Sequence, residues 1–131
     1  MCGICGVFLR DPSGRVPNSV IPAMMDRMQR RGPDDSGVFT RAGGALGHGR
    51  LTIIDRVGGC QPMMTPKEDG VLVTNGEIYN DPELRQTFVH DVVSETAGDT
   101  EVLLHLLAGM GSGALTHVNG MYAFAYWDLE K

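Results

Sequence analysis

The sequence predicts a layered α+β fold. Strand-like and helix-like segments come in blocks, with strands before, between and after two helices, and not in the strict alternation of a βαβ chain. The 131 residues are enough for one domain with a core, and 42% of them are hydrophobic, as in ordinary folded proteins. Eighteen glycines predict many turns and several close approaches of the backbone.

The first half of the chain predicts three strands around one helix. We expect a strand over residues 3–9, a turn at 11–14, and a helix that Asn18 caps and that carries Pro22 in its first turn. Its apolar residues recur at helical spacing and predict a core-facing stripe: Val20, Ile21, Met24, Met25 and Met28. Residues 37–39 and 45–48 predict a hairpin joined by Gly43-Gly44, and 51–54 continue as extended chain.

The second half predicts a strand, a helix and a last strand. Residues 71–74 form the strand, which is expected to run into a glycine turn at 75–76. A helix over 100–110 carries an apolar face, with Asp99 as its expected cap and residues 111–113 as its end. Alternation over 121–127 predicts the late strand.

Charge and cysteine content exclude several classes of function. A net charge of −5 argues against nonspecific nucleic-acid binding and against an anionic membrane surface. No apolar run approaches the length of a membrane-spanning helix, and the start lacks the pattern of a secretory signal. Three cysteines, an odd number, favour free thiols and the reducing cytoplasm.

Cys2 is the most informative residue. If Met1 is removed, which the small cysteine side chain favours, Cys2 carries a thiol and a free α-amine. An ordinary thiol has a pKa of about 8.5 and an α-amine one of about 8, so one residue could supply both nucleophile and general base. The alternative is a small apolar residue that opens a strand, and position alone leaves both open.

The spacing Cys2-x-x-Cys5 fits a metal or redox site poorly. A structural zinc site needs four ligands, and only Cys60 and scattered histidines remain to supply the others. A redox pair usually opens a helix, whereas Cys5 lies inside the expected strand. We therefore expect Cys5 to pack in the interior and expect no metal site.

Three polar segments have both a structural and a functional interpretation. Arg50 lies beside an apolar stretch and needs an anionic partner, either Asp55 or a ligand carboxylate. The Asn75-Gly76 pair is either a simple turn or a pair of donors that meet at a developing oxyanion. Asp99 is either a helix cap or an acceptor for a ligand ammonium group.

The order of the motifs decides between these alternatives. The chain carries, in order, Met-Cys-Gly-Ile-Cys-Gly-Val, Arg-Arg-Gly-Pro-Asp-Asp-Ser-Gly, His-Gly-Arg-Leu-Thr-Ile-Ile-Asp, Gln-Pro, Asn-Gly-Glu-Ile-Tyr-Asn, Gly-Asp-Thr-Glu and Asn-Gly-Met-Tyr-Ala-Phe-Ala. This order closely resembles the class II glutamine amidotransferase domain. More narrowly, it resembles the N-terminal glutaminase domain of glutamine-hydrolysing asparagine synthetases.

The resemblance implies a fold, a reaction and a set of residues. The fold is the four-layer αββα sandwich of N-terminal-nucleophile hydrolases, and the reaction hydrolyses L-glutamine through a γ-glutamyl thioester. Cys2 matches the nucleophile, and Asn75 and Gly76 match the oxyanion donors. The expected substrate-binding residues are Arg50, which holds the α-carboxylate, Glu77 and Asp99 near the α-ammonium, and Leu51, Ile53 and Ile54 along the pocket. Arg31 and Asp34 match residues that shape a loop.

The resemblance also sets expectations for the whole polypeptide. We expect residues 1–131 to form a truncated glutaminase domain, with a sandwich that is incomplete at its C-terminus. We do not expect residues 1–131 to contain the synthetase domain that would bind ATP and magnesium, so we expect no cofactor for this domain and expect a separate synthetase domain or subunit as partner. The alternatives to an active glutaminase are a glutamine-binding module without turnover and an inactive fragment.

Overall fold

The computed structural model describes residues 2–51, 59–90, 92 and 95–131 of the chain. Two three-stranded antiparallel sheets and three α-helices make up the described part. In chain order the elements are β1 (Gly3–Phe8), α1 (Val20–Met28), β2 (Asp35–Arg41), β3 (Gly44–Arg50), β4 (Met63–Met64), β5 (Gly70–Ile78), α2 (Asp81–Phe88), α3 (Asp99–Met110), the 3-10 helix η1 (Gly111–Thr116) and β6 (Gly120–Asp128). The α+β class predicted from the sequence is confirmed.

The first sheet has the strand order β1-β3-β2, so β3 lies at its centre. The predicted hairpin is confirmed, with Arg41 opposite Gly44. Its loop is therefore Ala42-Gly43, one residue earlier than expected. Gly43 has a φ of 91°, in the left-handed region that glycine enters without strain.

The second sheet has the order β4-β5-β6, and β5 pairs with β6 over its whole length, from Gly70 to Ile78. The predicted turn at 75–76 is wrong, because Asn75 and Gly76 continue the strand opposite Ala123 and Tyr122. The long-range pairing with β6 overrides the local turn preference of the Asn-Gly dipeptide.

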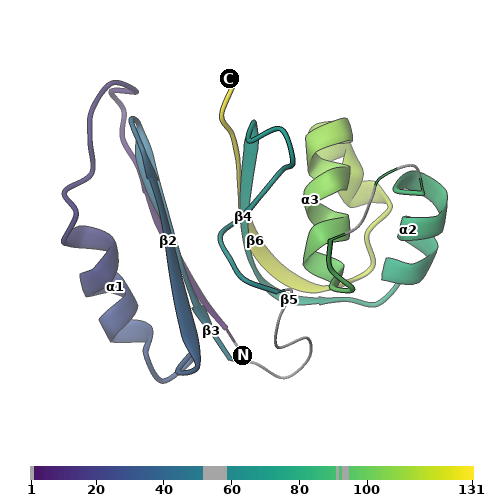
Figure 1. Cartoon of the computed structure of the whole chain (residues 1–131), viewed down its shortest axis with the longest axis horizontal. Coiled ribbons are helices and arrows are strands. Elements are labelled where there is room, and N and C mark those ends of the chain that lie inside the picture. The colour runs from purple at the N-terminus through teal and green to yellow at the C-terminus, as the bar shows by residue number, and fades with distance from the viewer. Residues whose placement is uncertain (1, 52–58, 91, 93–94) are drawn as a thin grey trace.

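The two sheets face each other, and each has helices on its outer face (Figure 1). Helix α1 covers the sheet of β1, β2 and β3, whereas α3, with α2 beside it, covers the other sheet. No helix in the described residues is long and apolar enough to cross a membrane.

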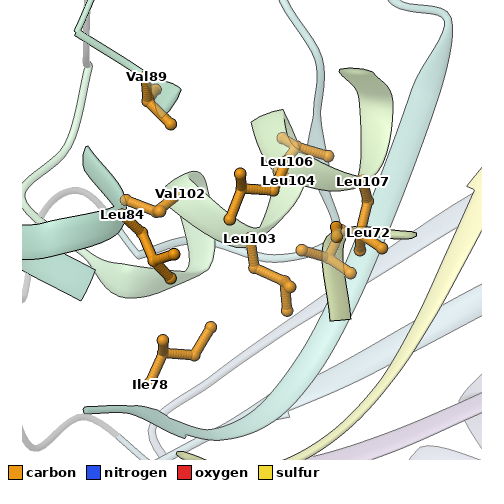
Figure 2. Packing of buried hydrophobic residues seen from close by; sticks show 10 residues of the cluster. Leu72, Ile78, Leu84, Val89, Val102, Leu103, Leu104, Leu106 and Leu107 are labelled. Atoms are coloured by element: carbon orange, nitrogen blue, oxygen red, sulfur yellow. The ribbon is translucent and has the colours of Figure 1, made fainter. Parts of the chain in front are cut away.

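Three apolar clusters hold these layers together. One lies between α1 and its sheet, around Ile21 and Ala45, and a second lies between the sheets, around Leu46 and Val73. The largest lies between α3 and the second sheet, and Figure 2 shows leucines of α3 packed beside Leu72 and Ile78. The predicted stripe of α1 is confirmed as a packing face, with Ile21 its buried member.

Both predicted helix caps are wrong. The N-cap of α1 is Ser19 and not Asn18, and it makes no capping hydrogen bond through its side chain. The N-cap of α3 is Gly98, and Asp99 is the first helical residue. The Asp99 carboxylate instead accepts a hydrogen bond from the Ile78 N–H at 2.7 Å, which fastens α3 to the end of β5.

Candidate active site

Side-chain alternation places the polar residues of the predicted site on the surfaces where the two sheets face each other. Ile4, Leu46 and Val73 belong to the cluster between the sheets. Residues two positions apart on a strand share a face. On the inner face of the first sheet, His48 and Arg50 therefore follow Leu46, and Cys2 precedes Ile4. On the inner face of the second sheet, Asn75 and Glu77 follow Val73.

This polar set lies at one end of the space between the sheets. At the other end Trp127 packs edge-on against the rings of Phe8 and Phe39. Strand β1 begins and β3 ends at the opposite end, beside β5 (Figure 1). The inner surfaces are therefore apolar at one end and carry a thiol, a guanidinium and an amide at the other.

Cys2 lies against the end of β3. Its sulfur accepts a hydrogen bond from the Leu51 N–H at 3.5 Å and lies 3.8 Å from the Leu51 carbonyl oxygen. The Arg31 Nε donates to the Cys2 carbonyl at 3.4 Å. Cys2 is half-buried, so its thiol is held in place without being enclosed in the hydrophobic core.

Arg50 is the last residue of β3 and is only 7% exposed. Its Nη1 lies 3.9 Å from the Cys60 sulfur, and its carbonyl accepts a hydrogen bond from the Asp34 N–H at 2.9 Å. Asp55, the proposed internal partner of Arg50, lies outside the described residues. A planar guanidinium can hold a ligand carboxylate through two parallel hydrogen bonds, which is the role that the resemblance implies for Arg50.

The loop that follows α1 packs on the same end of the sheet. Gly32 lies so close to the Gly49 backbone that a Cβ would not fit there. Arg31 and Asp34, on either side of Gly32, bond to the backbones of Cys2 and Arg50. The Arg31 contact comes from its side chain and the Asp34 contact from its backbone N–H, and the loop-shaping role that the resemblance implies for both stays a prediction.

Strand β5 presents the Asn75-Gly76 pair. The Thr74 N–H donates to Gln61 Oε1 at 2.6 Å and therefore points away from β6. Backbone N–H groups of a strand point alternately to its two sides, so the Gly76 N–H points to the same side as that of Thr74. The Gly76 N–H is thus turned away from the β6 ladder, and Gly76 itself is exposed.

The residues assigned to the substrate ammonium group lie beyond this pair. Glu77 is exposed, and Asp99 is half-buried with one carboxylate oxygen engaged by Ile78. The structure thus places Asp99 next to the end of β5. Of the predicted pocket residues, Leu51 is half-buried and contacts Cys2, whereas Ile53 and Ile54 lie outside the described residues.

Cys5 packs as the sequence predicts. Its sulfur lies 3.6 Å from the Met25 sulfur, on the α1 side of the sheet, and burial raises the pKa of the Cys5 thiol. Within the described residues no group of three or more histidine, cysteine, aspartate or glutamate side chains is placed to hold a metal ion.

Two residues near the site were not predicted. His48 is 1% exposed, and within the described part of the chain its Nε2 has no hydrogen-bond partner. Burial lowers the pKa of the His48 imidazole and Arg50 acts in the same direction, against the backbone of Thr74 and the Asp35 carboxylate. The second residue is Gln61, whose contact with Thr74 joins segments that are distant in sequence.

The sequence of the whole chain defines the class of protein. Residues 1–131 match the family model described as a glutamine amidotransferase domain, and the chain belongs to this family. It is 36% identical over 132 residues to asparagine synthetase B (glutamine-hydrolysing) of Escherichia coli K12, and 38% identical over 134 residues to asparagine synthetase (glutamine-hydrolysing) 3 of Bacillus subtilis 168. These matches cover 100% of this chain but only 24% and 22% of the relatives.

Two solved structures have a fold similar to that of this chain. One, described as the allosteric regulatory enzyme of purine biosynthesis, superposes with a TM-score of 0.57 at 27% identity over 69% of this chain and 22% of the other. The second is glutamine phosphoribosylpyrophosphate amidotransferase from B. subtilis, with a TM-score of 0.55 at 26% identity over 69% of this chain and 22% of the other.

Proposed function

We propose that this chain hydrolyses the side-chain amide of L-glutamine to glutamate and ammonia, with Cys2 as the nucleophile. The observation that carries the proposal is the position of the Cys2 sulfur. It is half-buried and hydrogen-bonded to the backbone of Leu51, the residue that follows the buried Arg50 in the chain. A nucleophile and a carboxylate-binding group are thus held by adjacent elements of one sheet.

The first half of the reaction forms a thioester. After removal of Met1, the α-amine of Cys2 accepts the thiol proton and the sulfur attacks the amide carbon of glutamine. Asn75 Nδ2 and the Gly76 N–H donate to the resulting oxyanion, and a donor of this kind contributes roughly 10²–10³-fold to the rate. The ammonium form of the Cys2 amine then protonates the leaving nitrogen, and ammonia departs.

The second half returns the free enzyme. The Cys2 amine takes a proton from water, which attacks the thioester carbon, and the same donors hold the second oxyanion. The carbon–sulfur bond breaks and the thiolate recovers its proton as glutamate leaves. No step requires a metal or a cofactor, so we assign neither to this domain.

Glutamine recognition is assigned to the surrounding residues. Arg50 holds the α-carboxylate, because a planar guanidinium pairs with a carboxylate through two parallel hydrogen bonds. Asp99 and Glu77 face the α-ammonium group. We assign the apolar part of the pocket to Leu51 and, as the resemblance implies, to Ile53 and Ile54, which lie outside the described residues.

The similarity to asparagine synthetases supports a proposal for the protein as a whole. We infer that residues 1–131 are a glutaminase domain with the four-layer αββα sandwich of N-terminal-nucleophile hydrolases, and that the ammonia serves asparagine synthesis or a related amidation. A separate synthetase domain or subunit would bind ATP and magnesium. The reducing cytoplasm is the compartment that keeps the Cys2 thiol free.

Glutamate release from glutamine tests the proposed activity. The wild-type chain should release glutamate and ammonia in equal amounts, and Cys2→Ala should release neither while its melting temperature stays unchanged. If glutamine raises the melting temperature of the wild type but no glutamate appears, the chain is a binding module and the hydrolytic proposal is wrong.

A further inference from the structure

Strand β5 loses one of its neighbours just before the Asn75-Gly76 pair. The short strand β4 pairs Met63 with Leu72 and Met64 with Val71, and no pairing with β4 extends to Thr74. On the other side β6 remains paired with β5 throughout. The N–H of Thr74 on the β4 side therefore needs another partner, since Thr74 is only 7% exposed.

Gln61 supplies that partner. Its Oε1 accepts a hydrogen bond from the Thr74 N–H at 2.6 Å. The Gln61 backbone packs against the other sheet, because its carbonyl oxygen lies so close to Gly37 of β2 that a Cβ at Gly37 would not fit. Gln61 thus connects β2 with β5, directly before the residues assigned to the oxyanion.

His48 supports the same backbone from the centre of the first sheet. It lies opposite Gly37 and Ile4, is buried in full, and interacts with the backbone of Thr74. The Thr74 N–H therefore has its acceptor in the Gln61 side chain, and the buried His48 imidazole belongs to the same neighbourhood.

We propose that Gln61 is a positioning residue for the oxyanion donors, an inference that rests on the proposed glutaminase function. The Thr74 N–H can point at Gln61 only if β5 keeps its regular alternation at this point. That alternation turns the Gly76 N–H away from β6 and directs the Asn75 side chain between the sheets. Loss of the Gln61 acceptor leaves the Thr74 N–H without its partner on the β4 side, while β6 still holds the other side of the strand. We expect the peptide before Asn75 to shift, so that the two donors no longer converge on one point.

The position of the hydrogen bond distinguishes this role from a general stabilising one. It is one residue away from Asn75 and two away from Gly76, and Gln61 is not part of a helix or strand. Its effect should therefore appear in the transition state, where the oxyanion exists, and not in substrate binding, which depends on Arg50.

The kinetic test compares two substitutions of similar size. Gln61→Met removes the acceptor, whereas Gln61→Glu keeps an oxygen at the same position; Gln86→Met, on the exposed face of α2, is the matched control. We expect Gln61→Met to lower kcat about 10–100-fold with KM changed less than about threefold, and Gln61→Glu to recover most of kcat. Unchanged kcat in Gln61→Met, or an equal loss in Gln61→Glu, would overturn the inference.

A second measurement separates this inference from the proposed function. Amide hydrogen exchange, followed by NMR, should be at least about tenfold faster at Thr74 and Asn75 in Gln61→Met. Exchange at Leu103, in the distant core, should be unchanged. If the wild type releases no glutamate, the proposed function fails, and the exchange rates still decide whether Gln61 orders this segment. Equal rates at Thr74 and Asn75 in both proteins would refute the inference.

Discussion

The backbone N–H of Leu51 donates a hydrogen bond to the Cys2 sulfur at 3.5 Å, so the proposed nucleophile lies beside the residue that follows Arg50. This contact follows from the register of the first sheet, in which Gly3 pairs with Gly49. The strand pairing thus brings the start of the chain and the proposed carboxylate-binding residue together.

Arg50 should control substrate affinity more than turnover. Arg50→Met removes the guanidinium that is assigned to the α-carboxylate, and we expect KM for glutamine to rise about 10–100-fold, as for a lost charged hydrogen-bond pair. Arg50→Lys keeps the charge without the bidentate geometry, so its KM should lie between those of the wild type and Arg50→Met. The exposed Arg10→Met is the control in this steady-state assay. A fall in kcat with KM unchanged would contradict the assignment.

Gly76 should tolerate no side chain. A Cβ at Gly76 would collide with the backbone of Met121 and Tyr122 on β6, so Gly76→Ala must displace the paired strands. We expect a loss of about 1–3 kcal/mol in the free energy of unfolding, measured with urea, and loss of glutamate release. Gly109→Ala is the matched control, because nothing lies within 4 Å of its Cβ position, and should stabilise α3 by about 0.5–1 kcal/mol. Equal stability of the two variants would count against the described pairing.

Protonation of the Glu101 carboxylate should lower the free energy of unfolding in the acidic pH range. Burial raises the pKa of its carboxyl, but N–H groups of Glu95 and Thr96, the Thr96 hydroxyl and His105 lower it, and the net pKa lies below its ordinary value. A carboxyl with a lowered folded-state pKa stabilises the fold above its ordinary pKa of about 4.3, and this stabilisation is lost as the pH falls below that value.

Glu101→Gln tests this assignment. At pH 7 the variant should lose about 1.5–3 kcal/mol in the free energy of unfolding, and the difference from the wild type should shrink as the pH falls from about 5 to 3. Urea unfolding at several pH values measures it, with the exposed Glu83→Gln as control. A difference that stays constant across this pH range would show that the carboxylate charge does not matter.

Leu103 should anchor the largest core cluster. It is fully buried between α3 and the second sheet (Figure 2), and Leu103→Ala should cost about 2–5 kcal/mol in thermal or urea unfolding. Met121 is 65% exposed, and Met121→Ala should change stability by less than about 0.5 kcal/mol. A similar loss of unfolding free energy in both variants would contradict the assignment of Leu103 to the core.

Much of the fold could be predicted because its signals are local. Alternating and helically spaced apolar residues located the hairpin of β2 and β3, the stripe of α1 and the last strand. The loop-shaping roles that the resemblance implies for Arg31 and Asp34 stay predictions; the Arg31 side chain and the Asp34 backbone N–H donate to the backbone of residues assigned to the site.

The failures come from contacts between distant segments. The Asn75-Gly76 dipeptide favours a turn until β6 pairs with it, and Asp99 is a good cap until the Ile78 N–H takes its carboxylate. Helix α2 was not predicted because Leu84 is its one buried residue, which leaves little periodicity to detect. The proposed role of Gln61 depends on its contact with Thr74, 13 residues further along the chain, and no local pattern reveals such a contact.

Intact mass spectrometry with a glutamine-analogue electrophile, such as a diazoketone, tests the central claim most directly. The account predicts a polypeptide that lacks Met1 and gains one adduct, which peptide mapping places on Cys2 and which excess glutamine prevents. The other two free thiols, on Cys5 and the exposed Cys60, should stay unlabelled. A chain that retains Met1 and takes up no adduct, or an adduct on Cys60 that glutamine does not block, would contradict the account.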